Sequence, residues 1–136
     1  MSSVATIKRN IIPPHLEVKG GRPLSGILKV SGAKNSSLAL MAASLLTKEK
    51  VLIKNVPQLT DIEVMAEILR HLGAKLTKTK NSLEINSTSI HSIELPYQLV
   101  HSLRASFFCV GPLLTRLGEA KIPFPGGCNI GARPVD

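Results

Sequence analysis

The residues best suited to chemistry lie in the last twelve positions of the 136-residue chain, from Pro125 to Asp136. This stretch reads Pro-Gly-Gly-Cys-Asn-Ile-Gly-Ala-Arg-Pro-Val-Asp and places Arg133 five residues after Cys128. A thiol near a cation is favoured as a thiolate or tuned as a proton donor. The glycines let backbone N–H groups approach a ligand closely. A turn-rich surface loop with an incidental cysteine is the alternative that composition leaves open.

A second candidate for chemistry is Lys34, which precedes a predicted helix over roughly 35–47. Apolar residues at helical spacing give this segment one buried face; they are Leu38, Met41, Ala42 and Leu45. Asn35 or Ser36 is expected to cap its first N–H groups. Lys34 would then lie where the helix dipole and an ammonium charge both attract anions. A solvated surface lysine is the alternative interpretation.

The elements that must position these residues alternate along the chain. Strands are predicted at 16–18, 27–30, 50–55 and 119–124, a hairpin over 74–79 and 82–87, and helices over 60–73 and 96–118. Thr60-Asp-Ile-Glu63 matches a capping box for the second helix, and Gly73 is its expected stop. Gly111-Pro112 is expected to kink or break the third. This order indicates an α/β (α+β layered) fold in which helices bury one face of a sheet.

Composition narrows the class of partner. The chain carries 17 Lys and Arg against 9 Asp and Glu, a net charge of +8, which suggests an anionic partner. The basic residues are dispersed and not interleaved with aromatic ones, so a small anionic ligand fits better than nucleic acid. A nucleic-acid-binding module is an alternative that rests on the charge alone.

Other classes of protein find little support in the sequence. No run of 18 apolar residues is free of charge and proline, so no membrane span is expected. Two cysteines do not make a disulfide framework or a metal site, and Cys109 is expected to be a small buried side chain. No apolar segment typical of a secretory signal follows Lys8 and Arg9, which favours a cytoplasmic location. The first sixteen residues include no acidic residue, so a short organelle-targeting extension is the alternative.

Three separated motifs together closely resemble the UDP-N-acetylglucosamine 1-carboxyvinyltransferases, which belong to the enolpyruvyl transferase family. The motifs are Ser31-Gly-Ala-Lys-Asn35, Leu103-Arg-Ala-Ser106 and the stretch from Pro125 to Asp136. The resemblance begins near Leu16 and covers nearly all of the chain. It implies two similar inside-out α/β domains with the active site between them, of which this chain would hold part. Residues 1–15 would be an irregular extension, 16–33 opening strands of the second domain, and 34–136 an incomplete first domain.

The resemblance also implies an activity. The family transfers the enolpyruvyl group of phosphoenolpyruvate to the 3-hydroxyl of UDP-N-acetylglucosamine, the first committed step of peptidoglycan synthesis. The reaction proceeds by addition and elimination, without a metal or an organic cofactor. Cys128 matches the family's proton donor, which can also form a covalent adduct. The residues that match the family's phosphoenolpyruvate site are Lys34, Asn35 and Arg133, and those that match its UDP-sugar site are Arg104, Arg133, Pro134, Val135 and Asp136.

Complete family members are roughly three times this length, a two-domain size, and hold a catalytic aspartate and a further arginine in the part absent here. The chain alone is therefore expected to be inactive, and exposed edges of an incomplete domain would favour self-association. A non-catalytic remnant that binds UDP-sugar or another protein is one alternative. The related shikimate-pathway enolpyruvyl transferase is another, although the Cys128 loop is not expected there.

Overall fold

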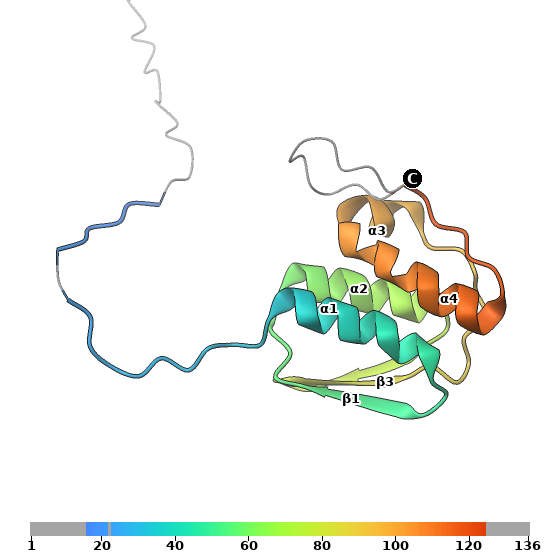
Figure 1. Cartoon of the computed structure of the whole chain (residues 1–136), viewed down its shortest axis with the longest axis horizontal. Helices are drawn as coiled ribbons and strands as arrows, with labels where there is room; N and C mark the ends of the chain where they lie inside the picture. Colours follow the sequence, from blue (N-terminus) through green and yellow to red (C-terminus); the bar gives the residue numbers. More distant parts are fainter. Residues whose placement is uncertain (1–15, 22, 125–136) are drawn as a thin grey trace, which may run out of the picture.

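The computed structural model describes residues 16–21 and 23–124. One outer layer is a three-stranded antiparallel sheet in the order β1-β3-β2, built from β1 (Lys50–Lys54), β2 (Lys75–Lys78) and β3 (Ser82–Asn86). Helices α1 (Lys34–Ala43) and α2 (Thr60–His71) cover one face of this sheet (Figure 1). The layered α/β fold predicted from the sequence is confirmed, as are the strand near 50–55 and the hairpin.

The sheet divides its side chains by the two-residue period of a strand. In β1 and β3, Ile53 pairs with Leu83, and Ile85 lies in the next inward-facing row. All three are buried against the helices, whereas Leu52, which points the other way, is 56% exposed. The core therefore lies between the sheet and the helices, and the outer sheet face is open to solvent.

Helix α1 begins one residue earlier than predicted and is continued by the 3₁₀ turn η1 (Ser44–Leu46). The predicted apolar face is confirmed, because Leu38, Met41, Ala42 and Leu45 are all buried. The predicted cap is wrong: Ala33 is the N-cap residue and no side chain caps the helix. Asn35 and Ser36 instead lie within the first turn and are exposed.

Helix α2 begins at Thr60 and ends before Gly73, as the sequence predicts, but its N-terminus is not capped as predicted. Gly73 has φ +104°, and the N–H groups of Gly73 and Ala74 donate to the carbonyl oxygens of Arg70 (2.9 Å) and Leu69 (2.9 Å). This pair of bonds is the Schellman arrangement that a C-terminal glycine permits. The predicted capping box is wrong, because Leu59 is the N-cap residue and no side chain bonds there. The Glu63 carboxylate pairs with Lys78 of β2 instead.

The third predicted helix is three segments, α3 (Tyr97–Ser102), the 3₁₀ helix η2 (Arg104–Cys109) and α4 (Val110–Leu117). The chain breaks at Leu103, whose backbone is extended (φ −136°, ψ 103°) and whose side chain is buried. The predicted break at Gly111-Pro112 is wrong. Pro112 is the third residue of α4, where a backbone N–H would have no intrahelical acceptor, so proline costs little there.

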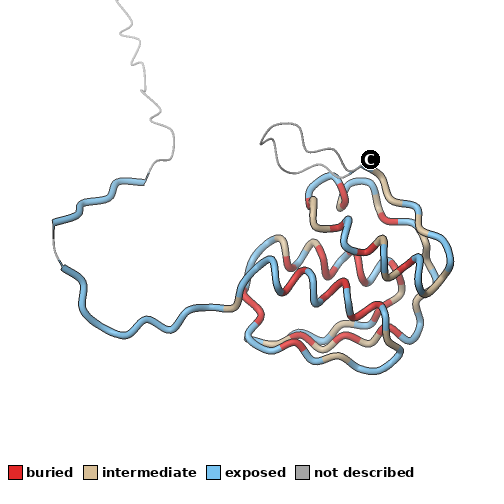
Figure 2. Tube along the Cα trace, viewed as in Figure 1, coloured by how far each residue is buried: buried red, intermediate tan, exposed pale blue. Residues whose placement is uncertain are grey.

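Helices α3 and α4 form a further layer on the side of α1 and α2 that faces away from the sheet (Figure 1). Figure 2 shows buried residues recurring along α1 and α2, whereas α3 and α4 contribute the buried residues Val100 and Leu113. Among the residues that the structure describes, no helix is long and apolar enough to cross a membrane.

The strands predicted at both ends of the described chain do not form. Residues 16–21 and 23–33 contain no β-ladder, extend away from the layered body (Figure 2) and are almost entirely exposed. The strand predicted at 119–124 is reduced to one parallel bridge between Glu94 and Lys121. A strand needs a neighbour for its backbone N–H and C=O groups, and the described residues offer none beside 16–33. The assignment of 16–33 to a second domain stays a prediction.

Candidate functional site

Lys34 is the first residue of α1, so the predicted position at a helix N-terminus is confirmed. Its Nζ donates a 2.6 Å hydrogen bond to Oδ2 of Asp61, the second residue of α2. The Lys34 and Asp61 side chains are 46% and 36% exposed, so the ion pair is open to solvent. An ammonium at this place is accessible to an anionic ligand arriving from outside.

The start of α1 is held by a close backbone contact. A Cβ at Gly32 would overlap the carbonyl oxygen of Asn55, so only glycine fits there without a shift. Asn55 has φ 58°, a left-handed conformation that asparagine tolerates better than most residues. Both the N–H and the Oγ of Ser37 donate to the carbonyl oxygen of Ala33 at 3.0 Å. These contacts determine the direction in which the chain enters α1, and therefore where Lys34 lies.

Arg104 begins η2, directly after the extended Leu103, and is half-buried. The 3₁₀ helix η2 packs on α1, which carries Lys34 and Asn35. The elements that carry Lys34, Asn35 and Arg104, three of the predicted binding residues, are therefore in contact. Ser106, two residues further on, is fully buried, and its Oγ finds no hydrogen-bond partner within the described chain.

The other predicted site residues are Cys128, Arg133, Pro134, Val135 and Asp136, and all lie outside the described residues. Their roles, and those of Lys34, Asn35 and Arg104, stay predictions.

Cys109 has the properties of a core residue, as the sequence predicts. Its side chain has no exposed surface and its thiol is free. Burial raises the pKa of Cys109 from its ordinary 9.0 to about 12. A thiol in this state is neither a nucleophile nor an accessible proton donor near neutral pH.

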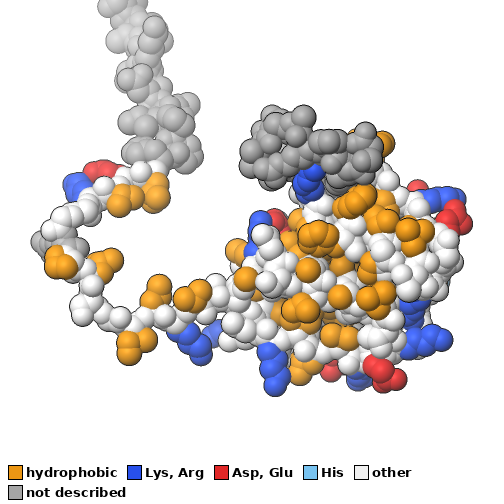
Figure 3. Space-filling view, viewed as in Figure 1, with side chains coloured by type: hydrophobic (Ala, Val, Ile, Leu, Met, Phe, Trp, Pro, Cys, Tyr) orange, Lys and Arg blue, Asp and Glu red, His pale blue; other side chains and the backbone are white. Residues whose placement is uncertain are grey.

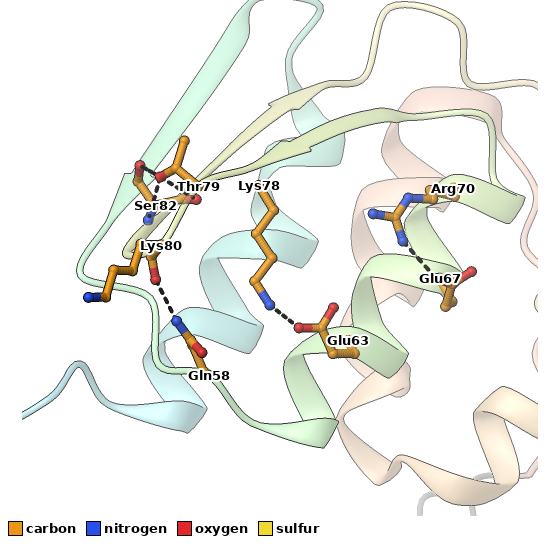
Figure 4. Close-up of polar contacts among 8 residues, drawn as sticks. All are labelled: Gln58, Glu63, Glu67, Arg70, Lys78, Thr79, Lys80 and Ser82. Carbon is orange, nitrogen blue, oxygen red and sulfur yellow. Dashed lines mark hydrogen bonds and ion pairs between the residues drawn. The ribbon is translucent and has the colours of Figure 1, made fainter.

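A group of polar contacts joins α2 to the β2–β3 turn (Figure 4). Lys78 pairs with Glu63, and Gln58 Nε2 donates to the carbonyl oxygen of Lys80 at 2.9 Å. The small pocket beside these contacts has room for about one water molecule; it is lined by Val56, Ile62, Glu63, Ala66, Arg70, Lys78, Thr79, Ser82 and Leu83. Because its two cations already pair with Glu63 and Glu67, we interpret this region as structural.

The residue that sequence reasoning missed is Asp61. It was interpreted only as part of a capping box, yet its carboxylate reaches Lys34 across 27 positions. No local pattern in the sequence relates Asp61 to Lys34, so the sequence offered no signal for this pair. Among the described residues, no three His, Cys, Asp or Glu side chains gather as a metal site would require.

The surface charge is scattered. Figure 3 shows Lys and Arg side chains spread over the visible face, while apolar side chains gather over α1 and α4. No basic stripe of the kind that follows a nucleic-acid backbone is visible on this face.

Comparisons with known proteins agree on one family. Residues 18–136 match the family described as EPSP synthase (3-phosphoshikimate 1-carboxyvinyltransferase). Two curated proteins named UDP-N-acetylglucosamine 1-carboxyvinyltransferase, from Prochlorococcus marinus strains NATL2A and NATL1A, are each 90% identical to the chain over 136 residues. A protein of the same name from Parasynechococcus marenigrum strain WH8102 is 54% identical over 135 residues, which is 99% of this chain and 31% of that protein.

The solved structures include a similar fold. The crystal structure of the enolpyruvyl transferase NikO from Streptomyces tendae matches with a TM-score of 0.65 at 30% sequence identity. The match covers 73% of this chain and 23% of that chain. The chain spans 30% of the length of the two Prochlorococcus relatives.

Proposed function

This chain belongs to the EPSP synthase family of carboxyvinyltransferases, and we propose that it supplies the phosphoenolpyruvate-binding side of a UDP-N-acetylglucosamine 1-carboxyvinyltransferase. The observation that carries this proposal is 90% identity over all 136 residues to relatives with that name. The proposed reaction transfers the enolpyruvyl group of phosphoenolpyruvate to the 3-hydroxyl of UDP-N-acetylglucosamine and releases phosphate. It is the first committed step of peptidoglycan synthesis, and we propose that it takes place in the cytoplasm.

The charges of the substrates explain why cations would be needed. Phosphoenolpyruvate carries a phosphate and a carboxylate, and we assign Lys34, Asn35 and Arg133 to them. The exposed position of Lys34 at the start of α1 supports this assignment. Planar guanidinium groups bind either anion through two hydrogen bonds. We assign Arg104, together with the segment from Arg133 to Asp136, to the UDP-sugar.

Protonation of the enol is the step that needs a thiol. A proton added to the methylene carbon leaves positive character on the neighbouring carbon. The sugar hydroxyl attacks that carbon and loses its proton, and departure of phosphate with loss of a proton from the new methyl group restores the double bond. The chain has two cysteines, and the burial of Cys109 removes that thiol from consideration. Cys128, which matches the family's proton donor, is the proposed donor here, because a thiol with a pKa near neutrality can give a proton and recover it within one cycle.

The proposal is tested with a chimaera in which these 136 residues replace their counterpart in the 90% identical relative from Prochlorococcus marinus NATL2A. Purified chimaera should release phosphate from phosphoenolpyruvate when UDP-N-acetylglucosamine is present. The Lys34→Gln and Cys128→Ala variants should lose most of this activity and keep the same melting temperature. The 136-residue chain alone should release no phosphate above background.

The acceptor distinguishes the two named activities of the family. If the chimaera used 3-phosphoshikimate and ignored UDP-N-acetylglucosamine, the proposed substrate would be wrong and the shikimate-pathway alternative right. If neither acceptor supported phosphate release but UDP-N-acetylglucosamine bound in a titration, a non-catalytic binding role would replace the proposal.

A covalent probe reports on Cys128 directly. A phosphonate epoxide that mimics phosphoenolpyruvate should add its mass to Cys128 of the chimaera and leave Cys109 unmodified. The Lys34→Gln variant should be labelled more slowly, because the phosphonate would lose a cation that attracts it. Labelling that is unaffected by this substitution would remove Lys34 from the anion site.

We also propose that the isolated chain self-associates through its exposed apolar side chains. Both edge strands carry lysines, Lys50 and Lys54 on β1 and Lys75 and Lys78 on β2, which oppose pairing at the sheet edges. The exposed apolar residues of the helical layers include Leu40, Leu46, Phe107, Phe108 and Leu114. Light scattering of the chain should show dimers or larger species that Leu40→Glu with Leu114→Glu reduces, while Leu52→Glu on the outer sheet face does not.

A further inference from the structure

Two helices of the described chain are linked by a charged contact at their first turns. The Lys34 ammonium of α1 lies 2.6 Å from the Asp61 carboxylate of α2. Figure 1 shows that α1 and α2 run side by side from the same end of the molecule. The packing of α1 against α2 therefore brings the two helix starts together, and with them the two charged groups.

A backbone contact also holds the two segments that lead into α1 and α2 close together. Gly32, two residues before Lys34, lies directly against the carbonyl group of Asn55. The chain then runs from Asn55 to the start of α2 at Thr60. One short connection thus positions the backbone on both sides of the Lys34–Asp61 pair, and a shift of either helix start would separate the two charges.

The contact also suits the chemistry of the two groups. A lysine ammonium has three N–H donors, and the Asp61 carboxylate accepts a hydrogen bond from one of them. The lysine side chain has four carbons that rotate freely in solvent, and a carboxylate at 2.6 Å restricts that rotation. A negative charge in the first turn of α2 is favoured by the dipole of that helix.

We propose that Asp61 is a positioning residue for Lys34. It holds the ammonium in one orientation at the start of α1, so that phosphoenolpyruvate meets a cation already in place. This inference rests on the proposed function of Lys34. It predicts that the loss of Asp61 weakens phosphoenolpyruvate binding even though it removes a negative charge from the neighbourhood of an anionic substrate.

The test compares variants of the chimaera. Asp61→Asn should lower kcat/KM for phosphoenolpyruvate by about fivefold, the upper range for an exposed ion pair. The change should appear in KM with kcat nearly constant, because a loosened Lys34 would bind ground and transition states less well alike. Asp61→Glu should restore most of the loss. Glu67→Gln removes another ion-paired carboxylate of α2 (2.7 Å from Arg70) and should leave KM unchanged.

A double-mutant cycle separates positioning from general structure. If Asp61 acts through Lys34, then Asp61→Asn should have no further effect on KM in a Lys34→Gln background. A loss that persists in that background would overturn the proposal. A lower KM for Asp61→Asn alone would also overturn it, because the carboxylate would then be competing with the substrate.

NMR of the 136-residue chain tests the Lys34–Asp61 pairing separately from the proposed role of Lys34 in phosphoenolpyruvate binding. The Lys34 side-chain signal in a lysine-labelled NMR sample, identified by its loss in Lys34→Arg, should move in Asp61→Asn and not in Glu67→Gln. If it does not move, the pairing is absent and the inference fails while the proposed function stands. If the pairing is present but Lys34→Gln leaves KM of the chimaera unchanged, the proposed role of Lys34 fails.

Discussion

The Arg116 guanidinium of α4 lies 2.8 Å from the carbonyl oxygen of Leu45, a residue 71 positions earlier in the chain. The same nitrogen donates to the carbonyl oxygen of Thr47 at 3.0 Å. These carbonyl groups lie where α1 and η1 end, and the last carbonyl groups of a helix have no partners within it. Arg116 therefore joins the outer helical layer to the end of the helix that carries Lys34.

Loss of this contact should destabilise the whole chain. Arg116→Met keeps much of the apolar stem and removes the charged donor, so we expect the free energy of unfolding to fall by about 1–2 kcal/mol. Arg70→Met is the matched control, since Arg70 forms an exposed ion pair with Glu67, and should change it by less than about 0.5 kcal/mol. Urea denaturation measures both. Equal effects of the two substitutions would show that the Arg116 contact contributes nothing specific.

The contact between Gly32 and Asn55 predicts a local change at the start of α1. Gly32→Ala places a methyl group against the Asn55 carbonyl and should displace the chain there. We expect the amide NMR signals of Lys34 and Asn55 to shift, and KM for phosphoenolpyruvate to rise in the chimaera. Gly20→Ala, where a methyl group would meet no other atom within 4 Å, is the control and should change neither.

Gly73 and Gly111 should respond to alanine in opposite ways. Gly73 has φ +104°, and an added Cβ would lie 2.5 Å from the Ser89 carbonyl oxygen. Gly73→Ala should therefore lower the free energy of unfolding by at least about 2 kcal/mol. Gly111 is in α4 with open space around it, so Gly111→Ala should raise it by up to about 0.5 kcal/mol through helix propensity. Thermal unfolding measures both effects, and this view would be contradicted if the melting temperatures of the two variants shifted in the same direction.

Burial of Cys109 predicts a pH dependence in the alkaline range. Because its folded-state pKa is about 12 against an ordinary 9.0, the buried thiol's contribution to stability is fully present below about pH 9. It is lost as pH rises from about 9 to about 12. The difference in stability between Cys128→Ser and Cys128→Ser with Cys109→Ala should shrink across that range.

The same burial can be tested by alkylation at pH 8. In the Cys128→Ser variant, Cys109 of the folded chain should react roughly a thousandfold more slowly than in denaturant, because the higher pKa lowers the thiolate fraction by about that factor. Rapid modification of the folded variant would show that the thiol is accessible.

Local patterns in the sequence predicted most of the elements near the candidate site. The stripe of Leu38, Met41 and Leu45 required a helix with one buried face, and Gly73 marked the end of α2. Such signals succeed because they depend on residues within one or two turns of each other. The burial of Cys109 was likewise expected from its apolar neighbours Phe107, Phe108 and Val110, and the structure confirms it.

The errors have a common physical cause. Thr60 was expected to cap α2, but the helix begins at Thr60 and the Glu63 side chain bonds to β2 instead of to the backbone. The break at Leu103 replaced the one expected at Pro112, because a proline in a first turn costs no hydrogen bond. In both cases the local sequence was compatible with two conformations. Tertiary contacts, or the place of the residue within its helix, determined which one forms.

Sequence patterns were sufficient for the order of the elements from α1 to β3, for the apolar faces that form the core, and for the family to which the chain belongs. The tertiary structure alone decided which charges meet, since Lys34 and Asp61 are 27 residues apart and no periodicity relates them. It also decided that Arg116 reaches the carbonyl group of Leu45. Hydrophobic periodicity is a property of neighbouring residues, whereas an ion pair between two helix starts exists only after the core has packed those helices side by side.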